Sequence, residues 1–117
     1  SALAVVHAHP VHAVALSLVE DEIIPVDSEG AYLLHKIPVL GAEHTIGSGE
    51  MEEKLPEVLR EYKIVMVRGH GSFAAGQMLE EAYQWTSSLE NTCRIICITR
   101  ALKGKIKDRR SAKYREW

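Results

Sequence analysis

Two histidines stand two residues apart where an apolar run of the chain ends. His7 and His9 belong to the segment VHAHP, residues 6–10. In a β-strand, residues i and i+2 project to the same face, so the two imidazoles are expected to point the same way. Two imidazoles on one face can share a divalent metal ion, and a third protein ligand leaves one coordination position open for a substrate. The spacing therefore predicts part of a catalytic metal centre.

His70 is the third ligand of this predicted centre. It follows the apolar run 63–68 and stands between two glycines, where the backbone can turn sharply. We expect the strands at His9 and at 63–68 to be neighbours whose carboxyl ends coincide, which brings His7, His9 and His70 together. Three neutral imidazoles suit Zn²⁺, which can then polarise a substrate oxygen, and manganese, iron or cobalt are alternatives.

Continuous apolar runs and short extended pieces predict the strands that position these ligands. Buried strands are expected at 3–9 and 63–68. Residues 32–34 and 36–40 are interpreted as brief extended pieces, and Pro38 favours an edge position in the sheet.

Apolar residues at helical spacing predict the helices. They are expected at 12–19, at 51–62 and from 77 to about 98. Pro56 is expected to kink or split the middle helix, and His12 on the first is expected to form a hydrogen bond near the site. The glycine-rich segment 41–49 and the DSEG segment 27–30 are expected as a loop and a turn. Alternating strands and helices with additional short strands predict an α/β fold.

The composition is that of one ordinary globular domain. Of 117 residues, 46% are hydrophobic and 26% are charged, and the formal net charge is −2. Neither nucleic acid nor a membrane is therefore an expected partner, and no apolar run approaches the ~20 residues of a membrane span. Cys93 and Cys97 are interpreted as small helix residues in a reducing cytoplasm, which is the expected location.

The basic tail, residues 103–117, is the one strongly charged segment of the chain. A solvated tail, or one docked on a neighbouring molecule, is the simpler interpretation, and nucleic-acid binding with a steep salt dependence is the alternative. Its basic and aromatic residues are Lys103, Lys105, Lys107, Arg109, Arg110, Lys113, Tyr114, Arg115 and Trp117.

Three segments taken in order resemble the class II aldolase and adducin family, and within it the L-fuculose-1-phosphate aldolases. They are AVVHAHPVHAVALS, IIPVDSEG and IVMVRGHGSFAAG, the last followed by a helix. The resemblance runs from Ala4 to about Arg100, although Gly69 stands where many members have asparagine. It implies zinc at His7, His9 and His70, a central and mainly antiparallel sheet flanked by helices, and a cyclic homotetramer.

The resemblance also implies an activity. A metal-dependent lyase of this kind cleaves a deoxyketose 1-phosphate such as L-fuculose 1-phosphate, reversibly, to dihydroxyacetone phosphate and an aldehyde. Methylthioribulose-1-phosphate dehydratase and pentulose-phosphate 4-epimerase are alternatives within the family, and an adducin-like interaction module is the non-enzymatic alternative. The resemblance further implies that Glu29, with Asp27 as second choice, and Tyr114 assist proton transfer.

Family members place a phosphate pocket, and often a glutamate acid or base, upstream of the paired histidines. Only residues 1–6 precede His7 here. Residues 1–117 are therefore expected to represent the C-terminal two-thirds of a single family domain that lacks its N-terminal part. The expected partners are a phosphorylated sugar, further copies of the chain and a separate N-terminal fragment.

Overall fold

The computed structural model describes residues 3–41 and 49–107 of the chain. The strands in these residues are β1 (Ala4–Ala8), β2 (Glu22–Ile23), β3 (Ile37–Leu40), β4 (Ile64–Val67) and β5 (Gly71–Gly76). The helices are α1 (Val11–Ser17), α2 (Ser28–Leu34), α3 (Gly49–Glu61) and α4 (Leu79–Leu102).

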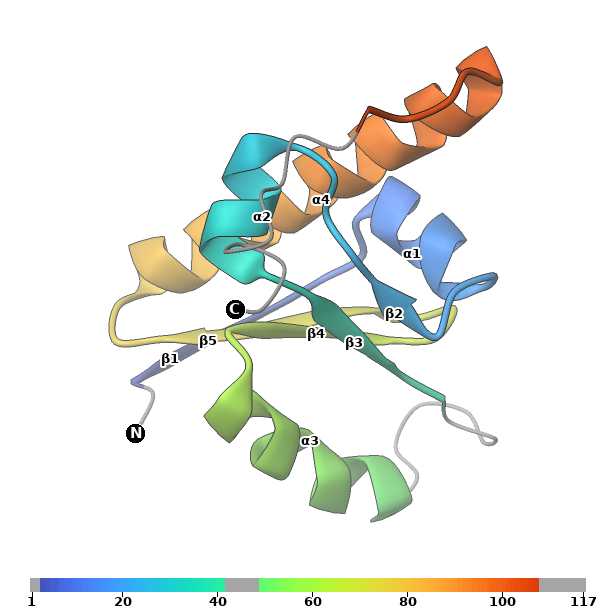
Figure 1. Cartoon of the computed structure of the whole chain (residues 1–117). Helices are drawn as coiled ribbons and strands as arrows, with labels where there is room; N and C mark the ends of the chain where they lie inside the picture. The colour runs from blue at the N-terminus through green and yellow to red at the C-terminus, as the bar shows by residue number, and fades with distance from the viewer. Residues whose placement is uncertain (1–2, 42–48, 108–117) are drawn as a thin grey trace.

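The described strands form one sheet in the order β1-β5-β4-β3-β2. Helices α1, α2 and α4 lie on one face of this sheet, and α3 lies on the other (Figure 1). Among the described strands only β3 and β4 pair in parallel, and the remaining pairs are antiparallel. The prediction of an α/β fold with a mainly antiparallel sheet flanked by helices is confirmed.

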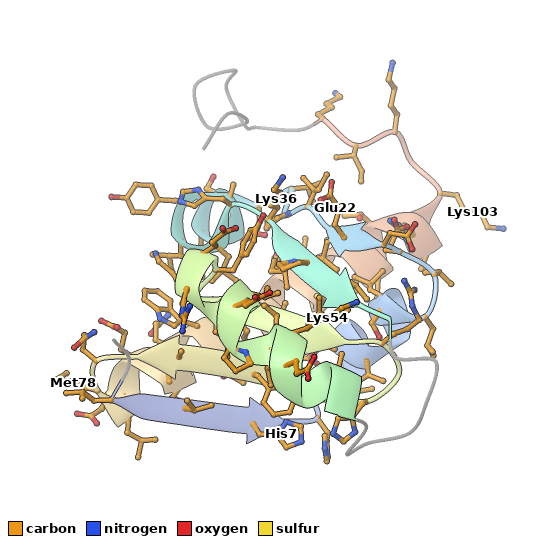
Figure 2. All side chains as sticks on the ribbon, turned by 90° about the horizontal axis from the view of Figure 1, so that it is seen from below. His7, Glu22, Lys36, Lys54, Met78 and Lys103 are labelled. Atoms are coloured by element: carbon orange, nitrogen blue, oxygen red, sulfur yellow. The ribbon has the colours of Figure 1, made fainter. Side chains whose placement is uncertain are left out.

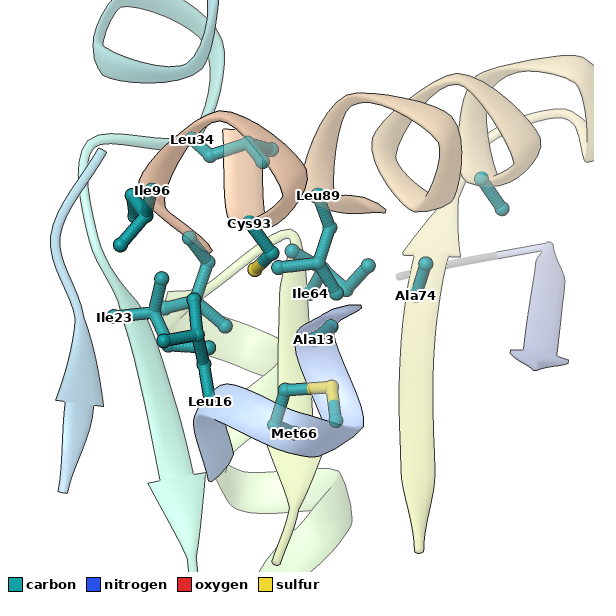
Figure 3. Packing of buried hydrophobic residues seen from close by; sticks show 12 residues of the cluster. Ala13, Leu16, Ile23, Leu34, Ile64, Met66, Ala74, Leu89, Cys93 and Ile96 are labelled. Atoms are coloured by element: carbon teal, nitrogen blue, oxygen red, sulfur yellow. The ribbon is translucent and has the colours of Figure 1, made fainter. Parts of the chain in front are cut away.

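The core lies between the sheet and the layer of α1, α2 and α4. All four residues of β4 are buried, as expected for a central strand covered on both faces. Each fully buried aliphatic side chain contributes about 1.5–3 kcal/mol relative to an exposed one. Figure 3 shows how the side chains of α1 and α4 meet those of the strands, and the buried cluster is Ala13, Leu16, Ile23, Leu34, Ile37, Ile64, Met66, Ala74, Ala82, Leu89, Cys93 and Ile96.

Strand β1, which carries His7, and strand β4, which precedes His70, are not neighbours. This corrects the expectation from the sequence. Strand β5 lies between β1 and β4 and pairs antiparallel with both. Because β1 and β4 each run opposite to β5, they run in the same direction, and their carboxyl ends still lie at the same end of the sheet. The segment GSFAAG was missed as a strand because its small residues carry no strong β signal.

The DSEG segment forms the start of helix α2, so the prediction of a turn there was wrong, as was that of extended structure at 32–34. Asp27 is the N-cap, and its carboxylate accepts a hydrogen bond from the Gly30 N–H at 2.9 Å. The buried Thr92 hydroxyl of α4 also donates to Asp27. The local cap and this long-range contact together favour a helix over a free turn.

Predictions about two prolines can be compared with the structure. Pro56 was expected to kink or split its helix, and it lies inside α3, which continues through it without a split. Pro38 pairs with Glu22 of β2, and Val39 of the same strand pairs with Met66 of β4, so β3 is not at the edge of the sheet. Most of the predicted glycine-rich loop at 41–49 lies outside the described residues.

Helix α4 continues slightly beyond its predicted end and stops at Leu102, where Lys103 adopts a left-handed C-cap conformation with φ 56°. Within residues 3–41 and 49–107, no helix combines the length and the apolar character that a membrane span requires.

Candidate metal centre

The register of β1 against β5 places His7 and His9 on one face of the sheet. His7 pairs with Phe73 and Ala8 pairs with Ser72. Exposure alternates along β1, and Val6 packs on the buried core, so His7 and His9 project from the opposite face. Figure 2, which views the sheet from the side of α3, shows His7 at the carboxyl end of β1.

His70 reaches the same place from the turn between β4 and β5. Its N–H donates to the Val67 carbonyl at 2.9 Å, and Gly69 before it has φ +69°, a conformation that side chains disfavour. A Cβ atom on Gly71 would lie 2.3 Å from the Ala8 carbonyl oxygen and 2.7 Å from Cδ2 of His9. Only glycine at position 71 lets the turn approach the end of β1 this closely.

The three imidazoles have the geometry of a metal-binding set. In the described part of the chain, His7, His9 and His70 are the one group of His, Cys, Asp or Glu that could hold a metal ion, with ligand atoms within 4.8 Å of one another. Nε2 of His7 and Nε2 of His9 are 3.1 Å apart. Zinc–nitrogen bonds of 2.0–2.1 Å in a tetrahedron separate two nitrogens by about 3.3 Å. The donor set therefore fits Zn²⁺ or a similar divalent ion.

Neighbouring groups fix the orientation of the His7 ring. Its Nδ1 lies 2.9 Å from the carbonyl oxygen of Ser72. A carbonyl only accepts, so Nδ1 of His7 carries the proton and its Nε2 presents a lone pair. Nε2 of His9 then donates to Nε2 of His7, and to bind a metal ion through Nε2 the neutral His9 ring would carry its proton on Nδ1 instead. Phe73 stacks on the His7 ring with centroids 4.2 Å apart and holds its plane.

The surroundings of His70 favour its neutral form. Desolvation lowers the pKa of His70 from its ordinary value of 6.5, and the positive charge that His7 and His9 carry when protonated lowers it further. A neutral imidazole is the form that binds a metal ion. The lowered pKa of His70 therefore favours its metal-binding form.

His12 is not part of the cluster, but it forms a hydrogen bond, as the sequence analysis expected. Its Nδ1 lies 2.7 Å from Oε2 of Glu90. Glu90 on α4 and Ser17 on α1, which contacts the turn of His70, were not singled out from the sequence. The available signal was a polar residue within or beside an apolar helical stripe, namely Ser17 next to Leu16 and Glu90 next to Leu89.

Of the two residues expected to move protons, the structure describes Glu29, and it does not bring Glu29 to the histidines of the same chain. Glu29 is exposed in the first turn of α2, which packs on α4. That layer lies on the face of the sheet opposite to the one from which His7 and His9 project. Tyr114 lies outside the described residues.

A groove adjoins the site on the histidine-bearing face. It has a volume of about 790 Å³ and lies between α3 and the strands β1 and β5. Phe73 contributes to its wall and also stacks on His7, so the groove borders the metal cluster. Arg60 and Lys63 add cationic groups, and Glu61 and Glu81 add anionic groups, to a largely apolar lining. Its volume lies in the usual range for small-molecule sites.

Fold and site together define an α/β domain with a trihistidine cluster at one end of its sheet. Comparison with known proteins identifies the family. Residues 1–97 match the model of the class II aldolase and adducin N-terminal domain. The chain belongs to the class II aldolase and adducin family.

Two solved structures and one sequence relative support this assignment. An L-fuculose-1-phosphate aldolase from Thermus thermophilus is 36% identical, with a TM-score of 0.83 over 90% of this chain. A sugar-phosphate aldolase from Thermotoga maritima is 25% identical, with a TM-score of 0.71 over 87% of this chain. Gamma-adducin from Mus musculus is 27% identical over 92 residues, or 78% of this chain.

The chain is shorter than each of these relatives. It spans 58% of the length of the Thermus aldolase, 47% of the Thermotoga aldolase and 13% of gamma-adducin.

Proposed function

We propose that the protein is a metal-dependent lyase that cleaves a deoxyketose 1-phosphate resembling L-fuculose 1-phosphate, reversibly, to dihydroxyacetone phosphate and an aldehyde such as lactaldehyde. The convergence of His7, His9 and His70 carries this proposal, because three neutral donors leave a divalent ion its full charge. The likeness to sugar-phosphate aldolases supports the substrate class. A Zn²⁺ ion held there supplies a Lewis acid for the substrate oxygens.

The protein's own groups hold the ligands and move the protons. The Ser72 carbonyl and the Phe73 ring keep Nε2 of His7 directed at the cluster. Cleavage breaks the carbon–carbon bond next to the carbinol carbon, and the hydroxyl proton of that carbon must pass to a base. We assign this base to Glu29 of a neighbouring copy of the chain, because in its own chain Glu29 lies beyond the opposite face of the sheet. Tyr114 is assigned an assisting role in the same proton transfer.

A homo-oligomer, with a tetramer as the specific expectation, belongs to the same proposal. Large apolar side chains are exposed at the start of α1 and just after its end: Val11 is 72% exposed and Val19 is 70% exposed. Contiguous apolar patches mark association surfaces, and we propose that these exposed side chains contribute to one. Both cysteines are free, which supports a reducing cytoplasm as the location. Sedimentation of the purified protein tests the assembly, and a stable single chain contradicts it.

The activity is tested by incubating the zinc-loaded protein with L-fuculose 1-phosphate and analysing the products. Dihydroxyacetone phosphate and lactaldehyde in equal amounts are the expected result. Loss of water from the sugar phosphate, or inversion at its C4, points instead to the dehydratase or the epimerase, each tested with its own substrate.

An adducin-like interaction module is the second candidate, and the likeness to gamma-adducin favours it. Such a module needs no metal ion and converts no sugar phosphate. A protein that binds zinc through the three histidines but turns over none of the candidate sugar phosphates supports the module over the enzyme.

A further inference from the structure

Helix α1 connects the two halves of the candidate metal centre. It begins two residues after His9 and ends at Ser17, beside the turn that carries His70. With seven residues, it is too short to be stable by itself. Its position therefore depends on the groups that hold its two ends.

Glu90 of α4 holds the amino end of α1. The local sequence offers no cap there, because Pro10 at the N-cap makes no side-chain hydrogen bond and the first turn has no acidic residue. Instead, Oε1 of Glu90 accepts from the N–H groups of His12 at 3.0 Å and Ala13 at 3.1 Å. Oε2 of Glu90 lies 2.7 Å from Nδ1 of His12. A carboxylate here satisfies the free amides and matches the positive end of the helix dipole.

Ser17 holds the carboxyl end of α1 against the turn of His70. Its side chain is 0% exposed. The hydroxyl donates to the Val14 carbonyl at 2.7 Å and accepts from the Gly69 N–H at 2.9 Å. Arg68 of the same turn donates from Nη1 to the Ser17 carbonyl at 2.7 Å. The residue directly before His70 is thus tied to the last turn of α1.

We propose that Glu90 and Ser17 are positioning residues that fix the two ends of α1 and thereby fix His9 relative to His70. Their effect on metal affinity rests on the metal centre proposed above. Neither residue belongs to the ligand cluster. Each instead holds the chain next to one ligand, and removing it leaves backbone amides without their acceptor, among them the amide of the buried Ala13. Groups that hydrogen-bond a metal ligand directly typically account for about 10–100-fold in metal affinity, and residues that act one step further out are expected at the lower end of that range.

The chain offers a matched control for each residue. Thr92 is also 0% exposed and donates its hydroxyl to Asp27 at the start of α2, so Thr92→Val removes a buried hydroxyl as Ser17→Ala does. Glu81 accepts from the Gln77 N–H at 3.0 Å near the start of α4, so Glu81→Gln changes a helix-end carboxylate as Glu90→Gln does. Neither control contact lies on α1 or on the turn of His70.

Metal affinity is measured by titrating Zn²⁺ against a competing chelator, with the visible spectrum of bound Co²⁺ as a report on ligand geometry. Ser17→Ala and Glu90→Gln are each expected to weaken zinc binding by up to about tenfold and to alter the Co²⁺ spectrum. The double variant is expected to lose less than the product of the two factors, because α1 released at one end no longer holds the other. Thr92→Val and Glu81→Gln are expected to leave both readouts unchanged, and equal losses in these controls overturn the proposal.

Imidazole NMR resonances of the metal-free protein separate this inference from the metal centre itself. Ser17→Ala is expected to shift the resonances of His70, and Glu90→Gln those of His9, whereas the controls move neither. If Glu90→Gln fails to fold, as judged by circular dichroism, Ser17→Ala alone decides. If these resonances do not shift, the proposed positioning role of Glu90 and Ser17 is wrong. If the resonances shift but the protein binds no zinc, the proposed metal centre is wrong and the positioning role of the two residues is retained.

Discussion

Strands β1 and β5 present one face to α1 and α4 and the other to the side of α3, and the residue types on these faces differ. Val6 and Ala74 face the helices and belong to the packed core or its margin. His7, His9 and Phe73 occupy the other face, where the two histidines are exposed. Because side chains alternate along a strand, burial of the first face fixes the position of the second.

This difference teaches that the core sets the geometry of the site without touching its chemistry. A slip of one residue in β1 would carry His7 into the core and Val6 out of it, which the packing strongly disfavours. Substitutions on the helix-facing side should therefore change stability, and those on the histidine side should change metal binding and turnover. The predictions below test that separation, beginning with the largest expected effect.

Glu29→Gln is expected to lower turnover of the zinc-loaded protein by about 10²–10⁴-fold with little loss of metal, because general acid–base catalysts contribute that much. Steady-state kinetics and metal analysis of the same samples provide the check. Glu29 lies in the helix layer of its own chain, away from the histidine-bearing face. The expected loss of turnover would therefore mean that Glu29 of a neighbouring copy acts at this face. Full activity with zinc retained refutes the assignment of Glu29.

Ile64→Ala, on the helix-facing side of β4, is expected to lower the free energy of unfolding by about 2–5 kcal/mol. Ile64 is 2% exposed and lies in the buried cluster, so truncation leaves a cavity there. Urea denaturation of the metal-free protein measures the loss. Zinc affinity of the folded variant is expected to match that of the wild type, and a large drop in affinity would show that the two faces are not separable.

Gly71→Ala tests the point at which the two faces meet. The added Cβ would lie 2.3 Å from the Ala8 carbonyl oxygen and 3.2 Å from Cε1 of His7, so the end of β1 must shift. Overpacking of this kind typically costs about 1–3 kcal/mol in stability, and we expect weaker zinc binding with it. Gly104→Ala is the control, because a Cβ there meets nothing within 4 Å. Unchanged affinity in Gly71→Ala contradicts the close approach described here.

The pH dependence is expected to be the smallest effect, because it follows from one group. The pKa of His70 is lowered in the folded protein, chiefly by desolvation, from an ordinary value of 6.5. The unfolded chain therefore binds more protons than the folded one once the pH falls below about 6.5. Stability of the metal-free protein is present above that pH and falls as the pH drops through the lowered pKa. Urea denaturation from pH 8 to pH 5 measures this, and His70→Asn should show a flatter dependence.

The sequence supports prediction of the parts of this fold that depend on local patterns. Runs such as IVMV predict buried strands, and the paired histidines with a glycine-flanked third predict the cluster that the structure brings together. Strand β5 escaped because glycine and alanine carry no strong β signal, and α2 escaped because DSEG is equally typical of a turn. The order of the strands could not be derived from the histidines. Whether β4 lies beside β1 or is separated from it by β5, the carboxyl ends of β1 and β4 lie at the same end of the sheet.

The contacts that hold the site were beyond local patterns for a different reason. Glu90 meets His12 across 78 positions of the chain, and Ser17 meets Gly69 across 52. Nothing in a single sequence pairs such residues. The helix stripe marks only where a polar group is buried, and the fold decides which partner satisfies it.

The central claim is that His7, His9 and His70 together bind one divalent ion, and metal analysis of the purified protein tests it most directly. After zinc is supplied and excess is removed at neutral pH, about one ion per chain is expected in the wild type, and His70→Ala is expected to retain almost none. Circular dichroism should show the same fold in both proteins, because the cluster lies outside the buried core. A wild-type protein without bound zinc, or a His70→Ala variant that keeps a full complement, contradicts the account.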